Sequence, residues 1–218
     1  MTGAGPMALE LCAAVVLLAA WLSLVHRRLE AQIYLYATQS AAIAGIAFLV
    51  SILYATPLLA VTGGLIVGLN VVVIPWLLRR ILRDLRIPPE INMLVSVRMS
   101  ALAGLGCLLL SVAVIGPLTP LAEIPAAGLL PIAVTVVLIG LFTTATRRKA
   151  FSQVLGILGM ENGVFLAGIA LTYGLGLLLE LGIAANLFVL AIVSRLFLHR
   201  MKDTFDTVDA DVLRSLEG

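Results

Sequence analysis

The feature that most constrains this chain is a series of long apolar segments separated by short polar or proline-containing joints. A helix needs about 20 mainly apolar residues to cross the hydrocarbon core of a bilayer. Seven segments meet this requirement, at residues 7–25, 32–53, 57–78, 91–115, 126–145, 150–174 and 181–199. Composition agrees, because 61% of the residues are apolar and only 12% are charged. The sequence therefore predicts an all-α polytopic membrane protein, a bundle of seven transmembrane helices.

The basic residues lie on one side of this predicted bundle. Arginine and lysine follow the first, third, fifth and seventh segments, whereas the loops after the second, fourth and sixth contain neither. Because cytoplasmic loops carry the excess of Lys and Arg, we expect the N-terminus outside and the C-terminus in the cytoplasm. The net charge of +2 then reflects topology and not nucleic-acid binding.

Two parts of the sequence resemble each other weakly. A double arginine precedes a helix of small and apolar residues in both "RRLEAQIYLYATQSAAIAGIAF" and "RRKAFSQVLGILGMENGVFLAG", and Asn70 matches Asn186 in the third and seventh segments. An internal duplication would explain this, and chance similarity among Leu/Ala/Gly-rich helices is the alternative. Within a single membrane domain, 1–218, the predicted parts are a three-helix unit at 1–86, a linking helix at 87–121, a second three-helix unit at 122–202 and a cytoplasmic tail at 203–218.

One acidic residue lies deep in an apolar segment. Glu161 follows Lys149 by 12 residues, which at about 1.5 Å per residue places it roughly 18 Å into a core about 30 Å thick. An ionised acid at that depth costs roughly 2.5–3.5 kcal/mol. The simpler interpretation is a protonated Glu161 that hydrogen-bonds a neighbouring helix. The functional one, which we favour, is that Glu161 faces the bundle interior or a water-filled path and exchanges a proton.

Other polar residues extend this candidate site. Gln39 and Ser40 occupy the corresponding depth of the second segment but cannot carry a proton charge, and Glu180 is expected at the outer membrane surface. Several glycines thin the sixth segment for close packing or for water: Gly156, Gly159, Gly163 and Gly168. The proton-path candidates are Glu161, Asn162, Asn186, Glu180 and Asn70.

The sequence contains no pattern typical of a disulfide, a metal site or a phosphate-binding loop. The two cysteines, Cys12 and Cys107, lie inside apolar segments without disulfide or metal spacing, and the two histidines lie at basic helix ends. There is no Cys/His cluster and no phosphate-binding loop. We therefore expect no catalytic residue, no metal site and no cofactor in this chain.

A family resemblance can be stated on two stretches. "TRRKAFSQVLGILGMENGVFLAG" followed by "ANLFVLAIVSRLFLHR" resembles hydrogenase-4 component E, a membrane subunit of energy-converting [NiFe] hydrogenases and formate hydrogenlyase-type complexes. The "MENGVFLAG" core is the specific part, and the whole chain matches in length and span layout. The last three segments also resemble the K-type subunit of complex I and the C subunit of multi-subunit cation/proton antiporters.

The resemblance implies roles for particular residues. In K-type subunits a double arginine opens the middle helix and a buried glutamate follows, and here Glu161 comes about one helical turn later on the same face. Glu161 would then belong to a polar axis along which protons cross between antiporter-like subunits. Component E proteins tend to have an Asp just before "LFV", where this chain has Asn186, which cannot ionise. Glu180 is the nearby acid that could replace it.

The resemblance also implies a function. The chain would be a non-catalytic membrane subunit of a complex-I-related hydrogenase or dehydrogenase assembly in a bacterial or archaeal cell (inner) membrane, contributing to proton or sodium-ion translocation coupled to a peripheral redox reaction. Its partners would be an antiporter-like large subunit, a complex-I H-type subunit and, through them, peripheral [NiFe]-hydrogenase-like and iron-sulfur subunits. The alternatives are a subunit of a cation/proton antiporter without a redox arm, and a structural bundle between ion-pumping subunits.

The charge pattern makes a testable prediction about topology. Single cysteines at Glu123 and Arg148, introduced without Cys12 and Cys107, should react with an impermeant maleimide from opposite faces of sealed cells, with position 123 outside. Labelling of both positions from the same face would contradict the seven-span arrangement.

Overall fold

The computed structural model describes residues 4–84, 94–119 and 126–172, and these residues form helices joined by short turns. Six of the helical spans are long and apolar enough to cross a membrane. The predicted all-α fold is thus confirmed for this part of the chain, and its six apolar helices are compatible with a multi-pass membrane protein. The predicted seventh span at 181–199, the tail, Glu180 and Asn186 lie outside the described residues.

Six spans make up the described bundle. The first two are α1 (Ala4–Val25) and α2 (Leu29–Tyr54), and the third consists of α3 (Pro57–Ile66), the π-helical η1 (Val67–Val73) and α4 (Ile74–Asp84). The fourth is α5 (Val97–Ile115), which continues into the 3-10 turn η2 (Gly116–Leu118). The 3-10 turn η3 (Ala127–Leu129) leads into α6 (Leu130–Thr146), and α7 (Ala150–Thr172) is the sixth.

Two helix ends differ from the prediction. The third span continues at least to Asp84, the last described residue before the gap, instead of ending near residue 78, and its last turns are amphipathic and include an exposed Arg80–Asp84 ion pair of 3.5 Å. The fourth begins at Val97 and not at 91, because the Ser96 side chain caps it by accepting a 3.4 Å hydrogen bond from the Met99 amide. Local polar chemistry therefore extends the third span and sets the start of the fourth.

The third span changes its winding before a proline. The π-helical turns end at Val73, and Pro75 follows at the start of α4. Proline has no N–H to donate, and its ring crowds the carbonyl four residues earlier. The wider π-helical winding relieves that crowding and allows a span with an internal proline to remain continuous.

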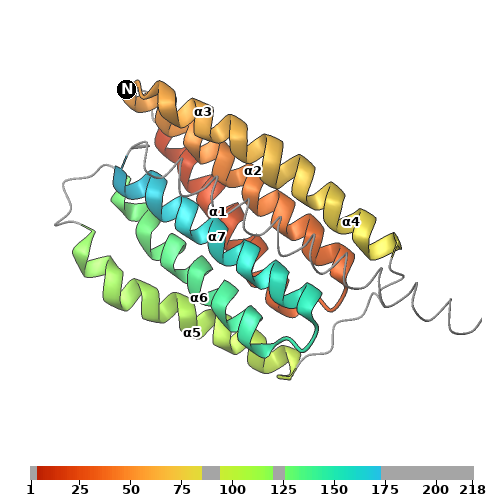
Figure 1. Ribbon diagram of the computed structural model, residues 1–218. Coiled ribbons are helices and arrows are strands. Elements are labelled where there is room, and N and C mark those ends of the chain that lie inside the picture. The colour runs from red at the N-terminus through yellow and green to blue at the C-terminus, as the bar shows by residue number, and fades with distance from the viewer. Residues whose placement is uncertain (1–3, 85–93, 120–125, 173–218) are drawn as a thin grey trace, which may run out of the picture.

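Four helices form the centre of the bundle (Figure 1). Helices α1, α2, α6 and α7 pack on one another, α3 and α4 cover the outer side of α2, and α5 packs against α6 and α1 at the opposite edge. The buried apolar side chains join the central helices, with Val16, Ile43, Val136 and Leu166 at less than 2% exposure. A second apolar cluster joins α2, α4 and α7 and includes Ile33, Leu78 and Leu158. Glu161 and its neighbours are therefore carried by the inner layer.

Helices α6 and α7 approach each other through glycine. A Cβ on Gly140 would lie 2.5 Å from the Met160 backbone nitrogen, and one on Gly156 would lie 2.8 Å from the Thr144 backbone nitrogen. Gly163 is equally close to Val137. Small residues let membrane helices approach backbone to backbone, where van der Waals contact replaces the hydrophobic effect. This contact confirms the packing interpretation for Gly156 and Gly163, whereas a Cβ on Gly159 would meet no atom within 4 Å.

The glycine contact predicts a position-specific loss of stability. Gly156→Val should lower the free energy of unfolding by at least about 1–3 kcal/mol, because its side chain would overlap the α6 backbone. Gly64→Val is the matched control, since a Cβ on Gly64 of α3 has no atom within 4 Å. Thermal unfolding in detergent followed by circular dichroism measures both. Equal midpoints for the two variants would contradict the close α6–α7 contact.

Candidate functional site

Glu161 lies near the middle of α7 and is 8% exposed. Both of its carboxyl oxygens are buried, and neither has a hydrogen-bond partner among the described residues. Buried polar atoms in proteins are nearly always hydrogen-bonded to protein or to ordered water. The carboxyl thus requires a partner from outside the described part of the chain, and water, residues 173–218 and a neighbouring subunit are the sources available.

Asn162, the next residue, joins α7 to α2. Its amide nitrogen donates to the Gln39 side-chain oxygen at 3.0 Å and to the Ser40 hydroxyl oxygen at 2.9 Å. The Ser40 hydroxyl lies 3.2 Å from the Asn162 amide oxygen, to which it can donate. All three side chains are buried. These bonds fix the register of α2 against α7 at the depth of Glu161.

Two further buried polar groups belong to this region. Tyr36 of α2 lies within electrostatic range of Glu161 and beside the Ser40 side chain, and its buried hydroxyl makes no hydrogen bond of full geometric quality among the described residues. Asn70 lies in η1, which packs against α2, and both polar atoms of its amide are also without a partner in that part of the chain. π-Helical turns occur frequently at functional sites.

The candidates predicted from the sequence thus have different outcomes. Glu161 and Asn162 lie together in the inner layer, and Asn70 is buried on a span that packs against the same helix, α2. The sequence indicates only the depth of Gln39 and Ser40, and the structure makes them partners of Asn162. Tyr36 and Gln32 are not among the residues predicted from the sequence. Their spacing from Gln39, at i, i+4 and i+7, places them on one helix face and was the available signal.

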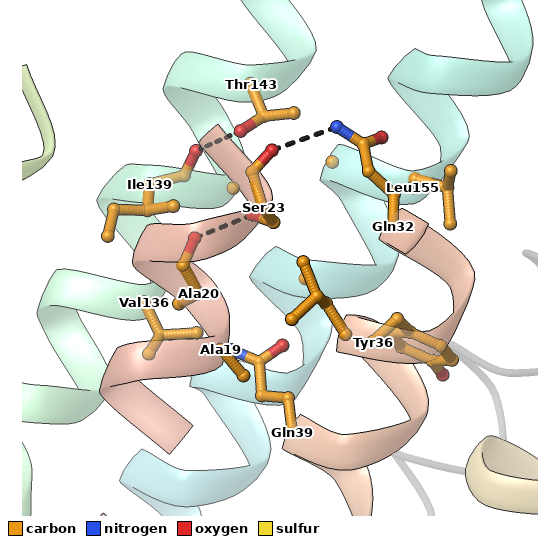
Figure 2. A pocket seen from close by; sticks show the side chains of 14 residues that line it. Ala19, Ala20, Ser23, Gln32, Tyr36, Gln39, Val136, Ile139, Thr143 and Leu155 are labelled. Atoms are coloured by element: carbon orange, nitrogen blue, oxygen red, sulfur yellow. Dashed lines mark hydrogen bonds between the residues drawn. The ribbon is translucent and has the colours of Figure 1, made fainter. Parts of the chain in front are cut away.

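A small cavity lies between α1, α2, α6 and α7, with a volume of about 30 Å³ (Figure 2). Its polar lining comes mainly from α2, through Gln32, Tyr36 and Gln39. Ser23 of α1 and Thr143 of α6 add hydroxyl groups, and apolar side chains and glycines complete the lining. The Gln32 amide nitrogen donates to the Ser23 carbonyl at 2.9 Å. The Gln32 side-chain oxygen and the Gln39 amide nitrogen are buried without a partner among the described residues.

Arg147 lies between α6 and α7 and points into the protein. It is 2% exposed, and its guanidinium donates to the carbonyls of Leu24 at 3.1 Å and Ser23 at 3.4 Å. Carbonyls in the last turn of a helix lack partners within that helix, and a cation there is favourable. Burial lowers the pKa of Arg147 to about 10, so the side chain remains cationic at neutral pH. Beyond its place in the basic-loop pattern, Arg147 therefore ties the α6–α7 turn to the end of α1.

Comparison with known proteins identifies one relative. The uncharacterized protein Rv0085 of Mycobacterium tuberculosis is 33% identical over 208 residues, which cover 95% of this chain and 94% of that protein. No protein-family model matches the sequence. No solved structure matches it either.

The Arg147 contacts predict different effects for two neighbouring arginines. Arg147→Met should lower the free energy of unfolding by roughly 1.5–3 kcal/mol, the range for hydrogen bonds to a charged group. Arg148→Met is the matched control, because Arg148 is exposed. Thermal unfolding of the two variants in the same detergent is the measurement. An equal loss of unfolding free energy in both variants would show that the positive charge of this turn stabilises the protein, and that the contacts of Arg147 to α1 do not.

Proposed function

We propose that this chain, which belongs to the same family as the protein Rv0085 of Mycobacterium tuberculosis, is a non-catalytic membrane subunit of a complex-I-related hydrogenase or dehydrogenase assembly. In that assembly it contributes to proton or sodium-ion translocation coupled to a peripheral redox reaction. The observation that carries the proposal is the Glu161 carboxyl, which is buried at mid-span with no hydrogen-bond partner among the described residues.

The chemistry of a carboxyl supports a role in proton transfer. A buried amide can join two helices without any risk of ionisation, and Asn162 already does so through Gln39 and Ser40. A carboxyl adds the ability to release and take up a proton. Because a charge inside a membrane is costly, ionisable residues in spans usually mark ion or proton paths. Because Asn162 already holds α7 to α2, the neighbouring Glu161 is better suited to exchanging a proton than to holding helices together.

The sequence supports the type of assembly. Residues 146–168 contain the "MENGVFLAG" core that resembles hydrogenase-4 component E, and the structure positions Glu161 of that core in the inner layer. The proposal includes the seventh span at 181–199, a cell (inner) membrane location, an external N-terminus and a cytoplasmic C-terminus. Asn162, Asn70, Asn186 and Glu180 remain the further candidates for the path.

The outer faces of the bundle are apolar and suit contact with lipid or with other membrane subunits. Helix α5 exposes Leu102 and Leu109 by about three fifths, and the proposed neighbours are an antiporter-like large subunit and an H-type subunit. Peripheral [NiFe]-hydrogenase-like and iron-sulfur subunits would be reached through these.

Replacement of Glu161 by glutamine tests the function. The chain is purified with its partners under mild solubilisation, the subunits are identified by mass spectrometry, and the complex is reconstituted in sealed vesicles. Glu161→Gln keeps the size and hydrogen bonding of the side chain and removes the exchangeable carboxyl proton. The mutant complex should retain the redox reaction measured with artificial acceptors and lose most of its ion-gradient formation.

Glu30→Gln is the matched control, because Glu30 is an exposed helical glutamate, and it should form a normal gradient. Normal gradient formation by Glu161→Gln would make Glu161 a structural hydrogen-bonding residue. Recovery of antiporter subunits without any redox subunit would favour the antiporter alternative. If Glu161→Gln prevents assembly, Glu161→Asp provides the milder change.

A further inference from the structure

We infer that the cavity between α1, α2, α6 and α7 is a water-binding site through which Glu161 exchanges its proton with the side of the membrane where Arg147 lies. The inference rests on the proposed function, because it specifies how a proton reaches Glu161. It concerns residues of α1 and α2 that the family resemblance does not assign, chiefly Gln32, Tyr36 and Gln39.

The cavity has the size and the polar groups that water requires. A water molecule needs a cavity of at least about 10–15 Å³ and two to four polar partners, and this cavity measures about 30 Å³. Gln39 and Gln32 are at most 4% exposed, and each has one amide atom without a partner in the described chain. Figure 2 shows the Gln39 amide nitrogen directed toward Ala19 of α1, across the cavity. One unpaired donor and one unpaired acceptor match a water molecule, which can serve both.

The lining argues against an ion. All of its residues are uncharged, and Glu161 is not among them. A cation in such a site would lack a carboxylate, and an anion would meet amide and carbonyl oxygens as well as donors. Neutral water is the ligand whose chemistry fits.

Hydrogen bonds extend from the cavity in both directions. Toward mid-span, the Gln39 side-chain oxygen accepts from Asn162, the neighbour of Glu161. Tyr36, another lining residue, lies within electrostatic range of Glu161. Its hydroxyl can both donate and accept a proton.

Toward the basic end, Gln32 donates to the Ser23 carbonyl at 2.9 Å, and Arg147 donates to the same carbonyl at 3.4 Å. The cavity therefore lies between the Asn162–Gln39 hydrogen bond and the Ser23 carbonyl that Gln32 and Arg147 share.

The step itself is a simple proton exchange. The O–H bond of the protonated Glu161 carboxyl breaks as its proton bonds to the Tyr36 hydroxyl oxygen, while the original Tyr36 hydroxyl proton passes to the cavity water. The reverse transfer restores the acid. The amides of Gln32 and Gln39 position the water and carry no proton themselves.

The test measures how fast Glu161 exchanges its proton in the full-length chain in lipid nanodiscs. After transfer from H₂O to D₂O, the infrared band of the protonated carboxyl shifts, and Glu161→Gln identifies the band by its loss. Gly159→Val should fill the cavity without a clash, because Gly159 lines it and a Cβ there would meet no atom within 4 Å. With the water excluded and only local opening left as a route, exchange should slow about tenfold or more.

Gly106→Val is the matched control, since Gly106 of α5 also has open space around its Cβ and does not line the cavity. It should exchange at the wild-type rate. Gln39→Leu, which removes the unpaired donor at similar size, should slow exchange as Gly159→Val does, and it decides the test if Gly159→Val does not fold. Wild-type exchange in the folded cavity variants would overturn the inference. Normal gradient formation by Glu161→Gln would overturn the proposed function and leave these exchange rates unchanged, so the two failures are distinguishable.

Discussion

The constraint on which this structure depends is that polar groups inside a bilayer must find partners within the protein. Within a helix the backbone N–H and C=O groups bond to one another. The remaining polar side chains must find partners on other helices, and their hydrogen bonds decide how the helices are aligned. Asn162 provides the central example, because its bonds to Gln39 and Ser40 hold α7 against α2. At the basic end Arg147 does the same for the α6–α7 turn and α1. Between these two ties the inner helices have little freedom to rotate or slide.

Close glycine contact complements these polar ties. Where Gly140, Gly156 and Gly163 let α6 and α7 touch, the two backbones leave no room for a side chain. Gly159 lies on α7, as Gly156 and Gly163 do, but it faces open space and lines the cavity. One glycine-rich sequence therefore produces a tight contact and a gap within a few residues. The gap lies beside the α2 face that carries Gln32, Tyr36 and Gln39.

The unsatisfied polar atoms are as informative as the satisfied ones. A buried network that stabilises a fold is expected to be fully bonded, because an unpaired polar group in a low-dielectric interior is costly. Here the Glu161 carboxyl and the Asn70 amide lack partners among the described residues, although Asn162 is well bonded. Hydrogen-bonded side chains such as Asn162 thus hold neighbouring polar groups that have no partner. This arrangement is suited to binding water or a group of a neighbouring subunit. This contrast links the packing of the inner helices to the proposed path.

The sequence alone determined the all-helical membrane character, the positions of the six described spans and the depth of Glu161, because apolar length is a property of each segment by itself. It placed the extension of the third span to Asp84 and the start of the fourth at Val97 less well, since these depend on amphipathic turns and on a serine cap. Only the tertiary structure decided that Asn162 bonds Gln39, 123 residues away, that Arg147 turns inward and that a cavity forms beside Gly159. A helix that is apolar on nearly every side has no preferred inward face in its own sequence, so its rotation is set by the neighbours it packs against.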